Sequence, residues 1–260
     1  MFSTNKRMKV PPRPESASPE IDLGIAIPAY REEARIAESL RLISEWMDST
    51  PLSVMVKVIV EKSPDNTLEV AQKSLLTMRN SERFEIVDNL VQRGKGYAVR
   101  SGMRRVGGKV RLFMDADLSV PLKEIDGAVS TIMSDGGPDV LIGTRHDGGH
   151  VMKKQGIIRR VGSRGYNLIL RALGLTGVSD TQCGFKLFKS AAADAIFRDA
   201  EVDGFGFDIE LLLLAKKHGF SVGQIPVEWY NAEGSKFDPM TDGPRVLLDA
   251  LKTRIKLGAK

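Results

Sequence analysis

The stretch VRLFMDADLSVPLKEI, residues 110–125, places two carboxylates directly after a short apolar run. The run Val110–Met114 predicts a buried strand, because short apolar runs bounded by polar turns are typical of sheet cores. Asp115 and Asp117 follow, and like charges this close raise the cost of ionising one another. A cation should offset them, and Mg²⁺ or Mn²⁺ suits two carboxylates on a tight turn because both ions take oxygen ligands. The competing interpretation is an acidic turn that caps the next helix.

The signals around this stretch alternate between strand and helix. Strand-like runs occupy residues 21–27, 54–60, 84–87, 110–114 and 140–143, with apolar residues at helical spacing between them. This alternation predicts an α/β fold with a mostly parallel sheet and helices on both faces. Ligands of such sheets bind beyond the carboxyl ends of the strands. The polar motifs that fall there are PAYREE, EKSPDNT, QRGKG and DADLS.

The second half of the chain is less regular. It predicts a loop at 146–156, helices at 158–173 and 207–218, strands at 184–188 and 225–230, and a basic amphipathic helix at 244–257. The first 20 residues are rich in Pro, Ser and Lys, which predicts a flexible arm. We therefore divide the chain into an arm (1–20), an α/β domain (21–240) and a C-terminal amphipathic helix (241–260).

Composition narrows the class of protein without choosing a function. The chain has 260 residues, of which 42% are hydrophobic and 27% charged, as in globular proteins with a substantial core. Its net charge of +5 fits an anionic partner, which can be nucleic acid, a phosphorylated substrate or an anionic membrane. A single cysteine, Cys183, predicts a reducing, cytoplasmic compartment. The pattern predicts neither a signal peptide nor a membrane-spanning helix.

Two further groups of residues predict anion binding. RGKG, residues 93–96, opens a predicted helix, where glycines let the backbone approach a phosphate and Lys95 adds a charge. The alternative is a simple loop with a solvated lysine. A basic run follows the fifth strand and suggests a phosphate-bearing acceptor, although a solvated basic face is the common explanation of such runs. It comprises Arg145, Lys153, Lys154, Arg159, Arg160 and Arg164.

Six motifs between residues 21 and 236 occur in the order of one known family. They are IPAYREE, QRGKGYAVRSGM, FMDADLS, SDTQCGFKLFKSAAADAIF, GFGFDIELLLLAKKHGF and IPVEWYNAEGSK. Together they resemble glycosyltransferase family two, whose metal-dependent catalytic domain has the GT-A fold. Within it they are similar to the dolichyl-phosphate glucosyltransferase and dolichyl-phosphate mannose synthase branch. DTQCGFKLF and EGSK are especially close to the glucosyltransferases.

The resemblance implies roles for individual residues. The nucleotide-binding set would be Pro28, Tyr30, Glu32, Glu61, Lys95, Asp115, Ser235 and Lys236. Asp115 and Asp117 would hold the metal. The acceptor phosphate would meet Arg145, Arg159 and Ser163, and the catalytic set would be Asp117, Asp180, Asp208 and Glu210.

The chain departs from the family pattern in two places. The family usually has DDGS after its second strand, whereas this chain has EKSPDNT, with Glu61 and Lys62 in place of the two aspartates. This departure falls on residues that choose between UDP and GDP. Many relatives also carry membrane-spanning anchors, whereas this chain ends in a basic amphipathic helix. Such a helix can lie on an anionic membrane, dock on a small membrane subunit, or simply pack on its own domain.

These observations predict an inverting, Mg²⁺- or Mn²⁺-dependent glycosyltransferase. It would move a sugar, with glucose favoured, from a nucleotide sugar, with UDP-glucose favoured, to a polyprenyl or dolichyl phosphate at the cytoplasmic face of a membrane. Mannose and N-acetylhexosamines are the alternative sugars. A family-two enzyme with a soluble small-molecule, glycan or protein acceptor is the alternative function. A non-catalytic phosphate or nucleic-acid binder leaves the aspartate pair without a role, so no nucleic-acid partner is expected.

Overall fold

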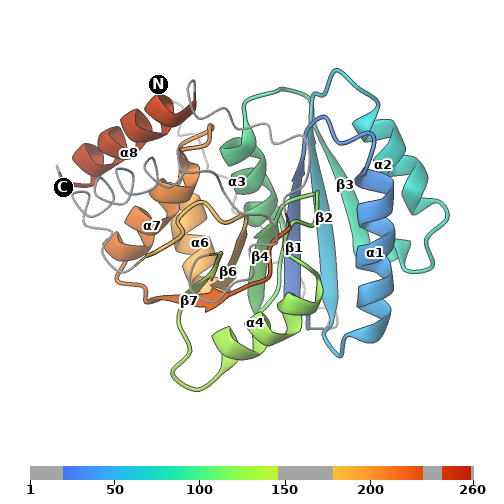
Figure 1. The fold of residues 1–260 in the computed structure, drawn as a ribbon, viewed down its shortest axis with the longest axis horizontal. Coiled ribbons are helices and arrows are strands. Elements are labelled where there is room, and N and C mark those ends of the chain that lie inside the picture. Colours follow the sequence, from blue (N-terminus) through green and yellow to red (C-terminus); the bar gives the residue numbers. More distant parts are fainter. Residues whose placement is uncertain (1–19, 146–177, 231–241, 259–260) are drawn as a thin grey trace, which may run out of the picture.

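The computed structural model describes residues 20–145, 178–230 and 242–258, which form a layered α/β structure. Its seven-stranded sheet has the order β3-β2-β1-β4-β6-β5-β7, from right to left in Figure 1. The strands are β1 Leu23–Ala29, β2 Val54–Glu61, β3 Phe84–Asn89, β4 Val110–Met114, β5 Val140–Thr144, β6 Phe185–Lys189 and β7 Val222–Pro226. The helices are α1 Ile36–Ser49, α2 Thr67–Leu75, α3 Lys95–Arg105, α4 Lys123–Met133, α6 Ser190–Asp199, α7 Phe207–Lys217 and α8 Asp242–Gly258, with a 3₁₀ turn η1 at Ser81–Arg83.

The mostly parallel sheet predicted from the sequence is confirmed, with one strand reversed. β1 runs parallel to β2 and β4, and β5 runs parallel to β7. β6 is antiparallel to both β4 and β5, so its first residue, Phe185, pairs with the last residue of β4, Met114. The start of β6 therefore lies at the same edge of the sheet as the carboxyl end of β4. This reversal is not predicted by the sequence pattern.

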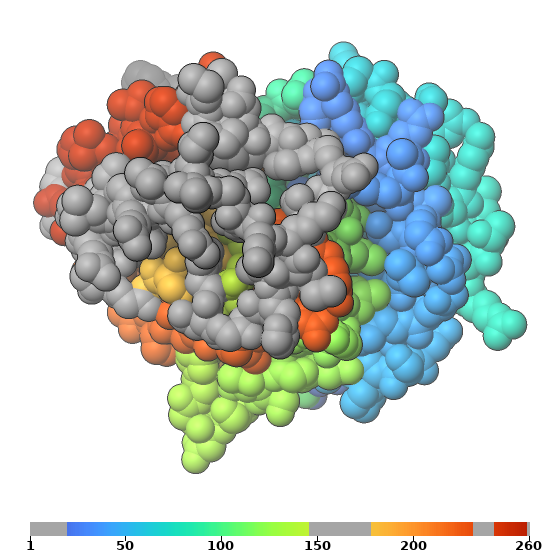
Figure 2. All heavy atoms as spheres, in the orientation of Figure 1, coloured from blue at the N-terminus to red at the C-terminus, as the bar shows by residue number. Residues whose placement is uncertain are grey.

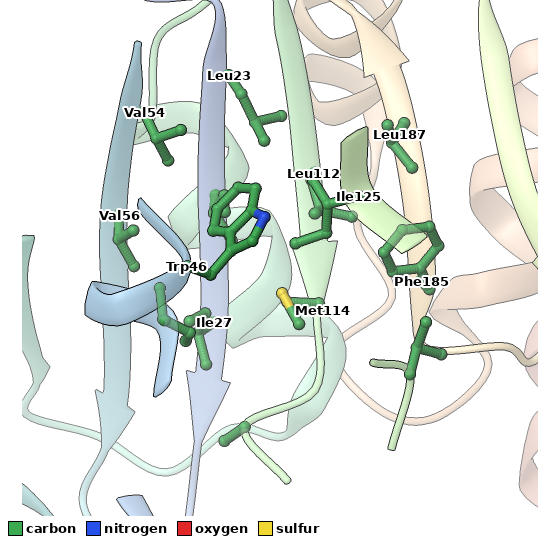
Figure 3. Close-up of a cluster of buried hydrophobic side chains, with 14 of the residues drawn as sticks. Leu23, Ile27, Trp46, Val54, Val56, Leu112, Met114, Ile125, Phe185 and Leu187 are labelled. Carbon is green, nitrogen blue, oxygen red and sulfur yellow. The ribbon is translucent and has the colours of Figure 1, made fainter. Parts of the chain in front are cut away.

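Two apolar clusters cover the two faces of the sheet. On one face, side chains of β1, β2, β4 and β6 meet Trp46 of α1 and Ile125 of α4 (Figure 3). On the other face, Phe113 and Phe188 pack with α3, α6 and α7. Each fully buried side chain of this size contributes about 1.5–3 kcal/mol of transfer free energy. β4 is buried on both sides, which is why four of the five residues in Val110–Met114 are apolar; the exception, Arg111, pairs with Asp194.

The structure corrects two details of the predicted elements. The last strand was expected at residues 225–230, but β7 spans Val222–Pro226, in register with β5. Pro226 is tolerated because β7 is the edge strand of the described sheet, and the N–H of Val227 still donates to the carbonyl oxygen of Thr144 at 3.2 Å. Helix α6 was not predicted, although its alanine-rich start, SAAADA, favours a helix. The predicted loop at 146–156 and helix at 158–173 lie outside the described residues, as does the arm apart from Glu20.

Helix α8 packs alongside α7 (Figure 1). Its Val246 and Ala250 are buried in the same cluster as the leucines of α7. Among the helices that the structure describes, none combines the length and the apolar character needed to cross a bilayer. The division of the chain at residues 20 and 240 stays a prediction.

Candidate functional site

Charged side chains meet at the carboxyl edge of the sheet, where β4 ends and α3, β6 and α7 begin. Lys95 Nζ, on the first residue of α3, lies 2.6 Å from Asp115 Oδ1. Asp208, on the second residue of α7, forms an ion pair with Lys186 of β6. Desolvation opposes the charge on Lys95, but Asp115 and Asp208 outweigh it and raise the pKa of Lys95 above its ordinary value. Lys95 is therefore one cation that offsets the carboxylates of the Asp115–Asp117 turn.

Lys95 belongs to the RGKG loop, which hydrogen bonds and ion pairs hold from two sides. Glu61, at the end of β2, accepts hydrogen bonds from the backbone N–H groups of Arg93 and Gly94, each 3.1 Å long. Gly94 has φ +124°, and a Cβ there would lie 2.7 Å from the carbonyl oxygen of Asp203. Only glycine satisfies both conditions. Burial raises the pKa of Glu61, against the effect of these two N–H donors. Glu61, expected near the nucleotide base, thus supports the RGKG loop.

Asp203, which was not among the predicted site residues, holds the other side of this loop. Its carboxylate pairs with Arg93 at 2.6 Å and also with Arg100. Its carbonyl oxygen accepts the N–H of Tyr97 at 3.1 Å. Asp203 lies in the segment before α7, far from the loop in sequence, so no local spacing signal marks it.

The Asp115–Asp117 turn is fixed by its own hydrogen bonds. Asp117 Oδ1 accepts from both the backbone N–H (3.0 Å) and the hydroxyl (2.6 Å) of Ser119. Leu118, between Asp117 and Ser119, has φ +51°, a left-handed conformation that is uncommon for a leucine and indicates a tightly held turn. Arg35 is a second cation near this turn. Its hydrogen bond to Glu32 raises its pKa most, and Asp117 and Asp115 add to the effect.

The start of β6 shapes the space beside Asp115. A Cβ on Gly184 would lie 2.0 Å from Asp115 Oδ2, so only glycine leaves room for this carboxylate. A small pocket opens here, lined by Met114, Asp115, Ser119, Val120, Gly184 and Trp229. Among the described residues there is no group of three His, Cys, Asp or Glu side chains that would hold a metal by itself. Two carboxylates on one turn supply the oxygen ligands that Mg²⁺ or Mn²⁺ prefer, and such ions take the rest of their ligands from substrate phosphates and water.

Arg145 and Asp180, predicted for the acceptor and catalytic sets, form one unit. Arg145 Nε and Nη2 lie 2.6 and 2.9 Å from the two carboxylate oxygens of Asp180. Desolvation works against the charge on Arg145, but Asp180 outweighs it and raises the pKa of the guanidinium. Its Cζ also lies 5.2 Å from the centre of the Trp229 ring. This bidentate geometry fixes a cation beside the end of β5.

Asp208 and Glu210 point to different places, although the sequence analysis put both at the reaction centre. Burial raises the pKa of Asp208, while Lys186 and Lys95 act in the opposite direction. Glu210 instead accepts the N–H groups of Glu201 and Val202, both at 2.9 Å. The structure thus brings Asp208 to the Lys95 side chain and uses Glu210 to hold the 201–202 turn.

The remaining predicted residues divide between the edge of the sheet and undescribed segments. Pro28 belongs to β1 and pairs with Ile59. Tyr30 follows β1, and the guanidinium of Arg31 lies 5.4 Å from the centre of its ring. Glu32 is buried; its carboxylate accepts from Arg35, and its backbone N–H donates to the hydroxyl of Thr67 at 2.8 Å. Four predicted residues lie outside the described residues, namely Arg159, Ser163, Ser235 and Lys236.

Cys183 lies next to this site and is predicted to be unreactive in the native protein. Burial raises the pKa of its thiol to about 12, so the nucleophilic thiolate is scarce at pH 8. We expect the folded protein to resist iodoacetamide at pH 8 and to react fully in urea, with mass spectrometry counting the adducts. The labelling rate of the folded protein should rise with pH. Rapid stoichiometric labelling of the folded protein at pH 8 would contradict this prediction.

Comparisons with known proteins place the chain in a family. The profile of Glycosyl transferase family 2 matches residues 24–197. The dolichyl-phosphate beta-glucosyltransferase of Saccharomyces cerevisiae is 32% identical over 253 residues, which cover 91% of this chain and 75% of the relative. The Homo sapiens protein of the same name is 28% identical over 254 residues, covering 92% and 76%.

Solved structures share the fold at lower identity. Glucosyl-3-phosphoglycerate synthase from Mycobacterium tuberculosis, in complex with Mn²⁺, uridine diphosphate and glucosyl-3-phosphoglycerate, has a TM-score of 0.66 at 17% identity, covering 91% of this chain and 80% of that one. Mannosyl-3-phosphoglycerate synthase from Rubrobacter xylanophilus has a TM-score of 0.67 at 17% identity, covering 90% and 73%. The predicted GT-A fold is confirmed. With a profile match that runs from β1 into α6 and includes the Asp115–Asp117 turn, the chain belongs to glycosyltransferase family 2.

Proposed function

We propose that this protein transfers glucose from UDP-glucose to a polyprenyl phosphate, with inversion at the anomeric carbon. The observation that carries the proposal is the Asp115–Asp117 turn with Lys95 beside it, at the edge of a GT-A sheet. The curated relatives named above are dolichyl-phosphate beta-glucosyltransferases, which supports this choice of sugar and acceptor. A lipid-linked acceptor would bring the protein to the cytoplasmic face of a membrane.

In the proposed reaction, a phosphate oxygen of the acceptor attacks the anomeric carbon of the sugar. A new carbon–oxygen bond forms, and the bond to the nucleoside diphosphate breaks with its electron pair on the diphosphate. The acceptor phosphate is already anionic near neutral pH, so little help from a general base is needed. The difficulty is negative charge, because two anions approach one another and charge grows on the leaving group.

The residues of the site would offset this negative charge in different ways. Asp115 and Asp117 would hold Mg²⁺ or Mn²⁺, and such an ion stabilises the charge of a leaving diphosphate. Lys95 adds a second positive charge, which its raised pKa keeps protonated across the neutral range. We assign Arg145 to positioning the acceptor phosphate, with Asp180 fixing its orientation. Arg159 and Ser163 on the acceptor side, and Ser235 and Lys236 on the diphosphate, remain proposals that rest on the family resemblance.

A donor screen tests this function directly. Purified protein is incubated with Mg²⁺ or Mn²⁺ and a polyprenyl phosphate in detergent. UDP-glucose, UDP-N-acetylglucosamine, UDP-N-acetylgalactosamine and GDP-mannose are offered separately, and mass spectrometry detects glycolipid. We expect a metal-dependent glycolipid from UDP-glucose. Hydrolysis of a donor without any lipid product would overturn the lipid acceptor and favour a soluble one.

Gly184 provides a sharp test of the site's geometry. Replacing it with Ala places a Cβ against Asp115 Oδ2 and must displace this carboxylate. We expect kcat/KM for glycolipid formation to fall about a hundredfold, the scale of a displacement of about 1 Å at a reacting centre. Gly127→Ala is the matched control, because no atom lies within 4 Å of a Cβ at this helical position. Full activity of Gly184→Ala, with an unfolding temperature close to that of the wild type, would contradict the assigned position of Asp115.

A further inference from the structure

Helix α8 turns a stripe of large apolar side chains toward solvent. Leu248, Leu251 and Ile255 are 55%, 51% and 62% exposed. Their spacing of three and four residues places them on one face of the helix. The opposite face carries Val246 and Ala250, which are buried against α7. The helix therefore has two apolar faces, and the fold covers only one of them.

Basic side chains border the exposed stripe on both sides. Arg245, Lys252 and Arg254 are all exposed. Successive helix residues lie about 100° apart, so Lys252 and Arg245 fall on one flank of the stripe and Arg254 on the other. The fourth basic residue, Lys256, is paired with Glu201.

The carboxylates of α8 leave this outward face clear. Between residues 242 and 258 the acidic side chains are Asp242, in the first turn, and Asp249. Asp249 lies on the packed side of the helix, because a Cβ on Gly206 would come within 2.6 Å of its own Cβ. The exposed stripe therefore carries no carboxylate and has basic residues on both flanks, with Asp249 within electrostatic reach of Lys252.

We propose that the α8 face formed by Leu248, Leu251, Ile255, Arg245, Lys252 and Arg254 docks on an anionic lipid surface. The inference deepens the proposed function, on which it rests for the need to reach a lipid-linked acceptor. An anionic bilayer complements both parts of the face, because apolar side chains enter the headgroup boundary while Arg and Lys meet lipid phosphates. A second copy of the chain fits less well, since a two-fold contact would place the same cations opposite one another.

The docking helix also contacts the catalytic loop through one intervening segment. Asp249 of α8 lies against Gly206, and the neighbouring carbonyl of Gly204 lies 2.8 Å from where a Cβ on Gly96 would be. Gly96 follows Lys95 in α3, and Asp208 follows this segment in α7. The segment at residues 204–206 thus connects the lipid-facing helix with both charged ends of the site. Figure 2 shows α8, in red, at the end of the molecule away from α2, in cyan.

Vesicle flotation tests the proposal. We compare vesicles of phosphatidylcholine alone with vesicles that also contain phosphatidylglycerol. The wild type is expected to float with the anionic vesicles, and less so at high salt.

Replacing Leu251 and Ile255 with Gln should weaken vesicle binding about tenfold, because the binding free energy loses the contribution of each methylene group that no longer enters the bilayer. Replacing Arg245, Lys252 and Arg254 with Gln should weaken it about fivefold for each charge removed. The control replaces two exposed apolar residues elsewhere, Leu76→Gln with Met133→Gln, and should float as the wild type does.

Two further measurements separate the outcomes. Glycolipid formation on a detergent-dispersed acceptor should be unchanged in the α8 variants, because these side chains lie outside the catalytic site. A wild type that forms glycolipid but does not float, or α8 variants that float normally, would overturn the docking face. So would light scattering that shows a dimer lost in the Leu251 and Ile255 variant while vesicle binding persists. Vesicle binding by a wild type that makes no glycolipid from any donor would refute the proposed function and support the docking face.

Discussion

Replacing Asp117 with Ala is expected to lower kcat/KM for glycolipid formation about a thousandfold, the largest effect on turnover that we predict. Asp117 is held by the N–H and hydroxyl of Ser119, so its carboxylate has a defined place on the turn that follows Asp115. Its loss removes one of the two carboxylates proposed to hold the metal. The charge that develops on the departing diphosphate then loses much of its stabilisation.

The same variant has a readout that does not depend on turnover. UDP with Mn²⁺ should raise the unfolding temperature of the wild type, and this stabilisation should be lost in Asp117→Ala. Ser119→Ala, which removes a hydrogen bond to Asp117, should lower activity about tenfold to a hundredfold. Asp135→Ala, an exposed aspartate after α4, is the matched control and should behave as the wild type does. Near-normal turnover of Asp117→Ala with metal present would exclude the proposed metal site.

Replacing Lys186 with Met is expected to destabilise the fold by about 3–5 kcal/mol, the largest effect on stability that we predict. Lys186 is 0% exposed and pairs with the buried Asp208. Its Nζ also donates to the carbonyl oxygen of Cys183 at 2.7 Å and lies 5.2 Å from the centre of the Phe113 ring. Removing the ammonium leaves a buried carboxylate without its nearest cation, and this cost exceeds that of losing a solvated pair.

The pH dependence of this variant follows from the Asp208 carboxyl. Burial already raises the pKa of Asp208, and losing Lys186 should raise it further. Between the unfolded pKa, about 3.9, and the raised folded pKa, the folded state binds more protons than the unfolded state, so stability falls as pH rises. The stability deficit of Lys186→Met relative to wild type should therefore shrink as pH is lowered through this window. Urea unfolding at several pH values measures the deficit.

A double variant separates stability from activity. In Lys186→Met with Asp208→Asn, the uncompensated charge is gone, so most of the lost stability should return. Activity should stay low, because Asp208 also acts on Lys95. Lys189→Met is the control at the end of the same strand, where the ammonium donates to the carbonyl oxygen of Gly137 at 2.7 Å. A deficit for Lys186→Met no larger than that for Lys189→Met would show that the buried pair adds little to stability.

Much of the fold was predictable because its signals are local. The run Val110–Met114 is buried on both faces of a sheet, and such burial selects apolar residues, which occupy four of its five positions. The carboxyl ends of parallel strands share one edge, so the Asp115–Asp117 turn and Lys95 were expected together, and the structure joins Asp115 and Lys95 at 2.6 Å. The reversed direction of β6 was not predictable in this way, because the pattern of a five-residue strand such as FKLFK does not indicate its orientation in the sheet.

The sequence by itself determined the alternation of strands and helices, and with it the edge of the sheet where the charged motifs gather. Only the tertiary structure decided what each charge contacts. Gly184 and Lys186 reach Asp115 and Asp208 through the reversed β6, and Asp203 reaches the RGKG loop from the segment before α7. Glu61 and Glu210, predicted from the sequence as site carboxylates, accept hydrogen bonds from backbone N–H groups. These partners depend on long-range packing. The residues next to a carboxylate in the sequence do not indicate whether it will bind a lysine, a metal or a backbone amide.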